Sequence, residues 1–224
     1  MNPRILAIDC GGPTGGIALL DGDNLVEEVT LEAPEGFGHL LFDQIARLLA
    51  RHKTPIQDID CFAAASGPGS FTGLRVALAA IKGLADASRK PAVGVSSLQA
   101  IAWHGSAPHR ACVLDARRGE IFGALYDSSL EPLAPEVVCP PAQFVSHVPE
   151  GEWEFLSPDF SLIESMLGRG RFAAMRRTRV PRSLAAATAH IARVRFEAGR
   201  AGDPAGLDAN YVRRSDAERF WVDP

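Results

Sequence analysis

A glycine-rich loop near the start of the chain could bind a phosphorylated ligand. Asp9 ends a short apolar run, and Gly11 and Gly12 follow closely. A carboxylate in this place can hold Mg²⁺, and the amides of a glycine-rich loop can bind phosphate. The same residues also suit a tight β-hairpin turn after a strand that ends in aspartate. Because residues 10–12 offer no hydroxyl group, we expect weak nucleotide binding at most.

A second glycine-rich turn lies at residues 66–73, with the sequence Ser-Gly-Pro-Gly-Ser-Phe-Thr-Gly. Its glycines and proline turn the chain sharply, and Ser70 is placed to cap the helix that follows. Such a turn at a helix N-terminus can hold a phosphate, or it can simply turn the chain. It lacks the Gly-Lys-Ser/Thr of a Walker loop and the Gly-x-Ser-x-Gly of a nucleophile elbow. Ser70 is therefore predicted to be a helix cap and not a nucleophile.

The helix predicted over Phe71–Ser88 is apolar on nearly every side, because only Thr72, Arg75 and Lys82 are polar before Ala85. One sheet covers one side of such a helix, so the sequence predicts that its other side contacts a second protein. Small side chains allow two helices to approach closely, and larger apolar ones supply contact area. The predicted contact residues are Gly73, Leu74, Ala77, Leu78, Ala80 and Ile81.

Composition is typical of a soluble globular protein with one large or two small domains. The chain has 224 residues, of which 46% are hydrophobic and 22% charged, and its net charge is −4. This charge argues against a dedicated nucleic-acid-binding protein, although not against a local basic patch. No apolar run reaches transmembrane length and the start does not resemble a signal peptide, so we expect a cytoplasmic protein without a membrane partner. The four widely spaced cysteines are expected to be buried, reduced thiols.

The pattern of strands is repeated in the two halves of the chain. Asp9 is followed by Asp21 twelve residues later, and Asp115 is followed by Asp127 at the same spacing. Each of these aspartates ends a short apolar run, and a third strand and helices follow each hairpin. Two such units predict an α/β protein with a duplicated ribonuclease-H-like fold. The actin-like and sugar-kinase superfamily has this architecture, with nucleotide bound between its halves.

The expected domains are residues 1–105, which include the partner-binding helix, and residues 106–224, a degenerate second copy. Residues 132–158 are rich in proline and are predicted to be irregular, and helices are predicted near 162–167 and 183–200. A cluster of arginines follows the first of these helices. It could contact RNA phosphates, or it could form a solvated face. Its members are Arg169, Arg171, Arg176, Arg177, Arg179 and Arg182.

Several motifs resemble those of the bacterial TsaB (YeaZ) family. The most specific are Ser-Gly-Pro-Gly-Ser-Phe-Thr-Gly-Leu-Arg-Val at residues 66–76 and Asp-Ala-Arg-Arg-Gly-Glu-Ile-Phe at residues 115–122. Supporting similarity covers most of the chain, from Ile-Leu-Ala-Ile-Asp at residues 5–9 to Tyr-Val-Arg at residues 211–213. The chain departs from the family at residues 11–12, where hydroxyl residues are more usual, and at residues 36–38, where a polar entry is usual.

The resemblance implies a protein that is not itself an enzyme. It implies a scaffold and activating partner of TsaD, which works with the small ATPase TsaE. Together they form threonylcarbamoyladenosine beside the anticodon of tRNAs that read codons beginning with A. Ser97 and Ile101 stand where TsaD has its metal-binding His-x-x-x-His pair, and neither residue type makes a stable metal site. The resemblance therefore implies no required cofactor, no catalytic metal, and contact with tRNA only through the complex.

The apolar helix Phe71–Ser88 is also expected to form a homodimer when TsaD is absent. Only one nearly all-apolar helix is visible in the sequence, and a soluble protein seldom exposes two large apolar patches. The homodimer and the complex with TsaD are therefore expected to use the same surface and to exclude each other.

Two other functions remain open at this stage. An active kinase or ATPase of the actin-like superfamily needs two phosphate loops, whereas the second loop here carries Arg117 and Arg118 and lacks paired glycines. A glycoprotease-like enzyme needs a metal pair or a nucleophile, and the sequence offers neither. A binding assay with ATP and Mg²⁺ would separate the kinase from the scaffold.

Overall fold

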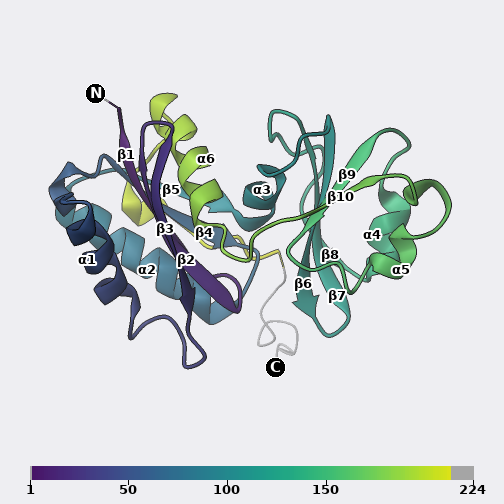
Figure 1. Cartoon of the computed structure of the whole chain (residues 1–224), viewed down its shortest axis with the longest axis horizontal. Coiled ribbons are helices and arrows are strands. Elements are labelled where there is room, and N and C mark those ends of the chain that lie inside the picture. Colours follow the sequence, from purple (N-terminus) through teal and green to yellow (C-terminus); the bar gives the residue numbers. More distant parts are fainter. Residues whose placement is uncertain (1, 213–224) are drawn as a thin grey trace, which may run out of the picture.

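The computed structural model describes residues 2–212, which form two five-stranded sheets with helices (Figure 1). The first sheet has the strand order β3-β2-β1-β4-β5. Its strands are β1 (Arg4–Asp9), β2 (Thr14–Asp21), β3 (Asn24–Glu32), β4 (Cys61–Gly67) and β5 (Ala92–Ser96). The second sheet has the order β10-β9-β6-β7-β8. Its strands are β6 (His109–Arg117), β7 (Glu120–Asp127), β8 (Val137–Cys139), β9 (Trp153–Ser157) and β10 (Arg176–Arg179).

The two sheets repeat one topology, as the paired aspartates predicted. In each sheet the first three strands are antiparallel neighbours, and the fourth and fifth run parallel to the first. Antiparallel neighbours can be joined by short turns, whereas parallel neighbours need a crossover segment, which is usually a helix. The fold is therefore a duplicated ribonuclease-H-like α/β fold.

Most predicted helices form within a few residues of their expected bounds. The helices are α1 (Leu41–Arg51), α2 (Phe71–Ser88), α3 (Ser97–Ala102), α4 (Pro141–His147), α5 (Glu164–Leu167) and α6 (Ala185–Glu197). Short 3-10 helices lie at Ile56–Asp58, Gly170–Phe172 and Pro204–Gly206. Helix α2 has the predicted bounds. It follows a serine cap and ends before Arg89, whose backbone is left-handed at φ 53°.

The third strand predicted for the second half forms as β8, but the prediction that residues 132–158 are otherwise irregular is wrong, because this stretch also contains α4 and β9. Helix α4 begins at Pro141, a position where proline is tolerated because the first helical amides need no partner within the helix. Strand β9 is buried at all five of its residues. A strand covered on both faces shows no alternation of polar and apolar residues, so periodicity did not reveal it.

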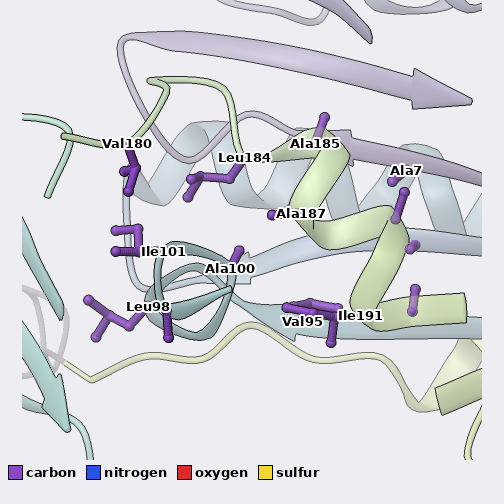
Figure 2. Packing of buried hydrophobic residues seen from close by; sticks show 14 of the residues in the cluster. Ala7, Val95, Leu98, Ala100, Ile101, Val180, Leu184, Ala185, Ala187 and Ile191 are labelled. Atoms are coloured by element: carbon purple, nitrogen blue, oxygen red, sulfur yellow. The ribbon is translucent and has the colours of Figure 1, made fainter. Parts of the chain in front are cut away.

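Helix α6 belongs to the last part of the chain but packs on the first sheet. It covers the face opposite to α1 and α2 (Figure 1). Alternate residues of β1 separate the two faces, since Ala7 lies in the cluster with α6 and Ile8 lies in the cluster with α1 and α2. Figure 2 shows Ala185, Ala187 and Ile191 of α6 close to the first sheet. Although α6 lies beyond residue 106, it packs with the first half of the chain.

One apolar cluster joins the two halves. It includes α3 and α6 together with residues of the second sheet such as Cys112, Tyr126 and Leu156.

All four cysteines are buried and unbonded, as predicted. No helix within residues 2–212 has both the length and the apolar character needed to cross a membrane.

Candidate functional site

The predicted Mg²⁺ ligand Asp9 is a buried carboxylate that two backbone amides bind. The residue is 2% exposed. Its Oδ1 accepts a hydrogen bond from Gly11 N at 2.9 Å, and its Oδ2 accepts one from Leu184 N at 2.9 Å. Burial raises the pKa of Asp9, the two amide bonds lower it, and the nearby charge of Glu28 raises it. The carboxylate thus connects the first glycine loop to the start of α6.

Two residues that the sequence analysis did not single out surround the start of α6. Ser183 Oγ donates to Glu28 Oε1 at 2.6 Å, and Ala186 N donates to the same oxygen at 3.2 Å. Glycine at position 16 allows this approach, because a Cβ there would lie 2.0 Å from Ser183 Oγ. Acidic groups near a helix N-terminus are stabilising because the free amides carry partial positive charge. The available signal was a serine at the start of the helix predicted near 183–200, since serine is common at helix N-termini.

The two glycine-rich loops lie against each other. Ser70 N donates to Gly11 O at 2.7 Å, and a Cβ on Gly69 would lie 2.6 Å from the same oxygen. A Cβ on Gly73 would lie only 1.9 Å from Cys10 O, so only glycine permits this contact. The prediction that Ser70 caps α2 is confirmed, since its Oγ accepts a hydrogen bond from Gly73 N at 3.3 Å. The first loop therefore lies directly against the start of α2.

The matching loop of the second half is built differently. Asp115 is exposed, and its Oδ1 accepts a hydrogen bond from Arg117 N at 2.6 Å. Arg117 and Arg118 both have left-handed backbone, with φ of 65° and 58°. Of the two equivalent aspartates only Asp9 is buried, so the two loops are not a symmetrical pair.

Ser97 and Ile101 lie in α3 and are both buried, with exposed fractions of 2% and 0%. Ile101 belongs to the apolar cluster that includes Val180 and Leu184, and Figure 2 shows these side chains at the start of α6 and beside α3. The hydroxyl group of Ser97 has no hydrogen-bond partner within residues 2–212. In the same part of the chain, no group of three or more His, Cys, Asp and Glu residues could hold a metal ion.

The six predicted contact residues of α2 face the interior of the chain, which corrects the prediction that they form a surface. All six are buried: Gly73, Leu74, Ala77, Leu78, Ala80 and Ile81. The helix is apolar on nearly every side, so its sequence did not show which side would pack on the sheet. The side with glycine at position 73 faces inward because the first loop approaches α2 there. The exposed residues of α2, which form its outward face, are Phe71, Thr72, Arg75, Ala79, Gly83, Asp86 and Ala87.

Comparison with known proteins places this fold in a family. Residues 33–194 match the family model of TsaD, tRNA N6-adenosine threonylcarbamoyltransferase. The tRNA threonylcarbamoyladenosine biosynthesis protein TsaB of Bacillus subtilis is 30% identical, over 98% of this chain and 98% of its own length. The chain belongs to the TsaB family. The Escherichia coli TsaB is also 30% identical, over 67% of this chain and 69% of that protein. The solved structure of YeaZ from Pseudomonas aeruginosa has the same fold, with a TM-score of 0.80 and 21% identity, covering 93% of this chain and 99% of that one.

In this TsaB-family chain an exposed aromatic cluster lies at the start of the outward face of α2. The Arg75 guanidinium lies 3.7 Å from the centre of the Phe71 ring, and its Nε donates to Tyr211 Oη at 3.1 Å. The rings of Phe71 and Tyr211 are 5.7 Å apart, and both residues are nearly half exposed. Tyr211, next to the last described residue, therefore packs on α2. Residue 213, which completes the Tyr-Val-Arg motif, lies outside the described residues.

The arginine cluster of residues 169–182 lies along one edge of the second sheet. All six arginines are exposed, and three of them, Arg176, Arg177 and Arg179, belong to the edge strand β10. Arg177 donates to Leu167 O at 2.6 Å, Arg171 donates to Val148 O, and Arg176 donates to Ser106 Oγ. Three of the six arginine side chains are thus hydrogen-bonded to neighbouring segments of this TsaB-family chain. Charged residues also suit an edge strand, because they discourage pairing with another sheet.

We expect Asp9→Asn to lower the free energy of unfolding by about 1–3 kcal/mol, the cost of a buried amide left without its acceptor. Asparagine has one acceptor oxygen, so either the Gly11 or the Leu184 amide would face an NH₂ group. Urea denaturation at pH 7 measures the effect. Asp115→Asn is the control, because Asp115 is exposed and asparagine can accept the same turn bond. Equal stability of the two variants would show that Asp9 does not anchor α6.

Proposed function

We propose that this protein is a non-catalytic partner of a TsaD transferase in the formation of threonylcarbamoyladenosine in tRNA. The modified base would lie beside the anticodon of tRNAs that read codons beginning with A. Membership of the TsaB family supports a role in threonylcarbamoyladenosine biosynthesis. One observation in α3 carries the non-catalytic role. Ser97 and Ile101 stand where TsaD has its histidine pair, and both are buried.

The chemistry of the reaction supports the same conclusion. Transfer of an acyl group from an adenylate needs a metal ion or hydrogen-bond donors placed at the carbonyl group. Ile101 supplies no ligand, the Ser97 hydroxyl is buried, and both oxygens of Asp9 accept backbone amides. The proposed role therefore requires no cofactor on this chain, and any nucleotide binding at the first loop would be weak.

We propose that TsaD docks on the outward face of α2 and on the neighbouring helix α1, which covers the same side of the first sheet (Figure 1). This side exposes large apolar groups on both helices, since Phe42 of α1 is 56% exposed and Phe71 of α2 is 46% exposed. The outward face of α2 also offers the small residues Ala79 and Gly83, which allow close approach of another helix. Because the TsaD family model matches this chain, the two proteins would form a pseudo-symmetric pair.

In this proposal the isolated chain forms a homodimer through the same face, so TsaD and a second copy compete for it. TsaE joins the complex of the two different proteins, and tRNA is bound through that complex. A stable species with two copies of this chain on one TsaD, joined through separate surfaces, would contradict the competition.

A reconstituted reaction tests the function. We expect TsaD, TsaE, threonylcarbamoyl adenylate and unmodified tRNA to give modified tRNA only when this protein is added, measured by mass spectrometry of the nucleosides. This protein alone with adenylate and tRNA should give none. Full modification by TsaD and TsaE without it would remove the scaffold role, and modification by this chain alone would show that it is catalytic.

A further inference from the structure

The arginine cluster of residues 169–182 gives one part of a net-negative chain a strong positive charge. Residues 165–196 contain eight arginines and no Asp or Glu, whereas the whole chain has a net charge of −4. All six arginines of the cluster are exposed, and none of them forms an ion pair with another residue of the described range 2–212. A surface of one charge sign without internal partners attracts ligands of the opposite sign.

The cluster stands on an ordered part of the second sheet. Its strand β10 pairs with β9, which is buried at all five residues. Arg177 donates to Leu167 O at 2.6 Å and Arg171 donates to Val148 O, so the segment before β10 is fixed as well. A guanidinium group carries several N–H donors, and one bond to a carbonyl leaves others for a ligand. Binding to such a surface costs little ordering of the chain.

Three arginines of the cluster keep all their side-chain donors for a ligand. The side chains of Arg169, Arg179 and Arg182 donate to no other residue in the part of the chain that the structure describes. Hydrogen bonds from Ser161 lower the pKa of Asp159, and the charges of Arg179 and Arg182 lower it as well. These two guanidinium groups therefore lie near one carboxylate, and so near each other, where β10 leads into the segment before α6.

This surface fits the phosphate groups of RNA better than it fits a protein or a membrane. No large apolar side chain is exposed between residues 138 and 193. Protein interfaces are centred on buried aromatic and apolar side chains, and segments that lie on membranes insert apolar side chains. Guanidinium groups alone suit phosphate, which they bind through paired N–H···O hydrogen bonds. Contacts to phosphate carry no base sequence, which suits a surface that meets several different tRNAs.

We propose that the arginine cluster binds phosphate groups of the tRNA while this protein is bound to TsaD. The inference rests on the proposed function, because it assigns part of the tRNA contact to this chain. The cluster belongs to the second sheet, whereas the proposed TsaD surface is on α1 and α2 over the first sheet (Figure 1). Docking of TsaD therefore leaves the cluster open. Because the whole chain is negatively charged, its arginines add to the contacts of TsaD and do not replace them.

A combined variant with Arg169→Gln, Arg179→Gln and Arg182→Gln tests the inference, since these three side chains hold no other part of the described chain. Fluorescence anisotropy measures the Kd of the complex with TsaD for an unmodified tRNA, at saturating TsaD. We expect the Kd to rise about 10- to 100-fold at about 0.1 M salt. The slope of log Kd against log salt should fall by about two to three, because each lost phosphate contact removes roughly 0.7–0.9.

The matched control combines Lys53→Gln, Arg89→Gln and Arg200→Gln, which removes the same charge from exposed positions outside the second sheet. Its Kd for tRNA should stay within about two-fold of the parent value, because these positions lie outside the arginine cluster. Calorimetric titration measures the affinity of both variants for TsaD, and the cluster variant should bind TsaD like the parent protein.

An unchanged Kd and salt slope in the cluster variant would overturn the inference, while the reconstituted reaction with the parent protein would still support the proposed function. Loss of TsaD binding by the cluster variant would overturn it as well, because the cluster would then belong to a protein interface. Sedimentation with vesicles of phosphatidylcholine and phosphatidylserine tests a membrane. Vesicle binding that only the cluster variant loses, with its tRNA affinity unchanged, would assign the arginines to a lipid surface. If the parent protein did not bind TsaD, both the inference and the proposed function would fail.

Discussion

Ala77→Glu is expected to unfold the protein under conditions in which the parent is folded. Ala77 is fully buried between α2 and the first sheet, in a cluster of apolar residues. A carboxylate there would lose its hydration without gaining a partner, at a cost of about 3–5 kcal/mol, which is a large part of the usual stability of about 5–15 kcal/mol. Thermal unfolding followed by circular dichroism measures the effect.

Ala79→Glu is the matched control for Ala77→Glu, because it introduces the same group two residues along the same helix, where the side chain is exposed. Its free energy of unfolding should lie within about 0.5 kcal/mol of the parent value, as for most surface substitutions. If Ala77→Glu were as stable as Ala79→Glu, the inner and outer sides of α2 would have been assigned the wrong way round.

The folded Ala79→Glu variant is in turn expected to lose its partner. In the proposed complex Ala79 lies at the centre of the outward face of α2, where a partner helix approaches closely. A charge buried there would weaken binding by about 2–4 kcal/mol, which corresponds to a roughly 30- to 1,000-fold higher Kd for TsaD. Calorimetric titration with purified TsaD measures this, and light scattering should show the variant as a monomer.

Ala142→Glu controls for the added charge, because Ala142 is an exposed alanine in α4, beside the second sheet and away from α2. It should bind TsaD like the parent protein. Undiminished binding by Ala79→Glu would exclude the outward face of α2 as the docking surface, while leaving the role in tRNA modification to be judged by the reconstituted reaction.

The sequence by itself determined those features that depend on neighbours along the chain. The hairpins that follow Asp9 and Asp115 were visible as short apolar runs and turns, and their repetition was sufficient to predict the duplicated fold. The bounds of α2 and its Ser70 cap were predicted correctly, because a helix end depends on local backbone conformation and on one side chain nearby.

Contacts between distant segments could not be predicted in this way. Strand β9 was missed because it is covered on both faces. Its buried Glu154 is stabilised by the amides of Ser106 and Ala107 and by Thr178, which come from two other parts of the chain. The segment 176–179 appeared only as part of an arginine cluster. It becomes a strand because β9 offers it a parallel neighbour.

The candidate site likewise has some features that the sequence predicted and others that depend on contacts between distant segments. Sequence patterns singled out Asp9, but its role depends on Leu184, which is 175 residues away and brings the start of α6 to the first loop. The composition of α2 likewise predicted a helix in need of cover on many sides. Which side faces the sheet was decided only by tertiary packing, because a helix that is apolar all round has no dominant apolar face. The close approach of Cys10 to Gly73 turns that side inward and leaves Ala79 and Gly83 facing outward.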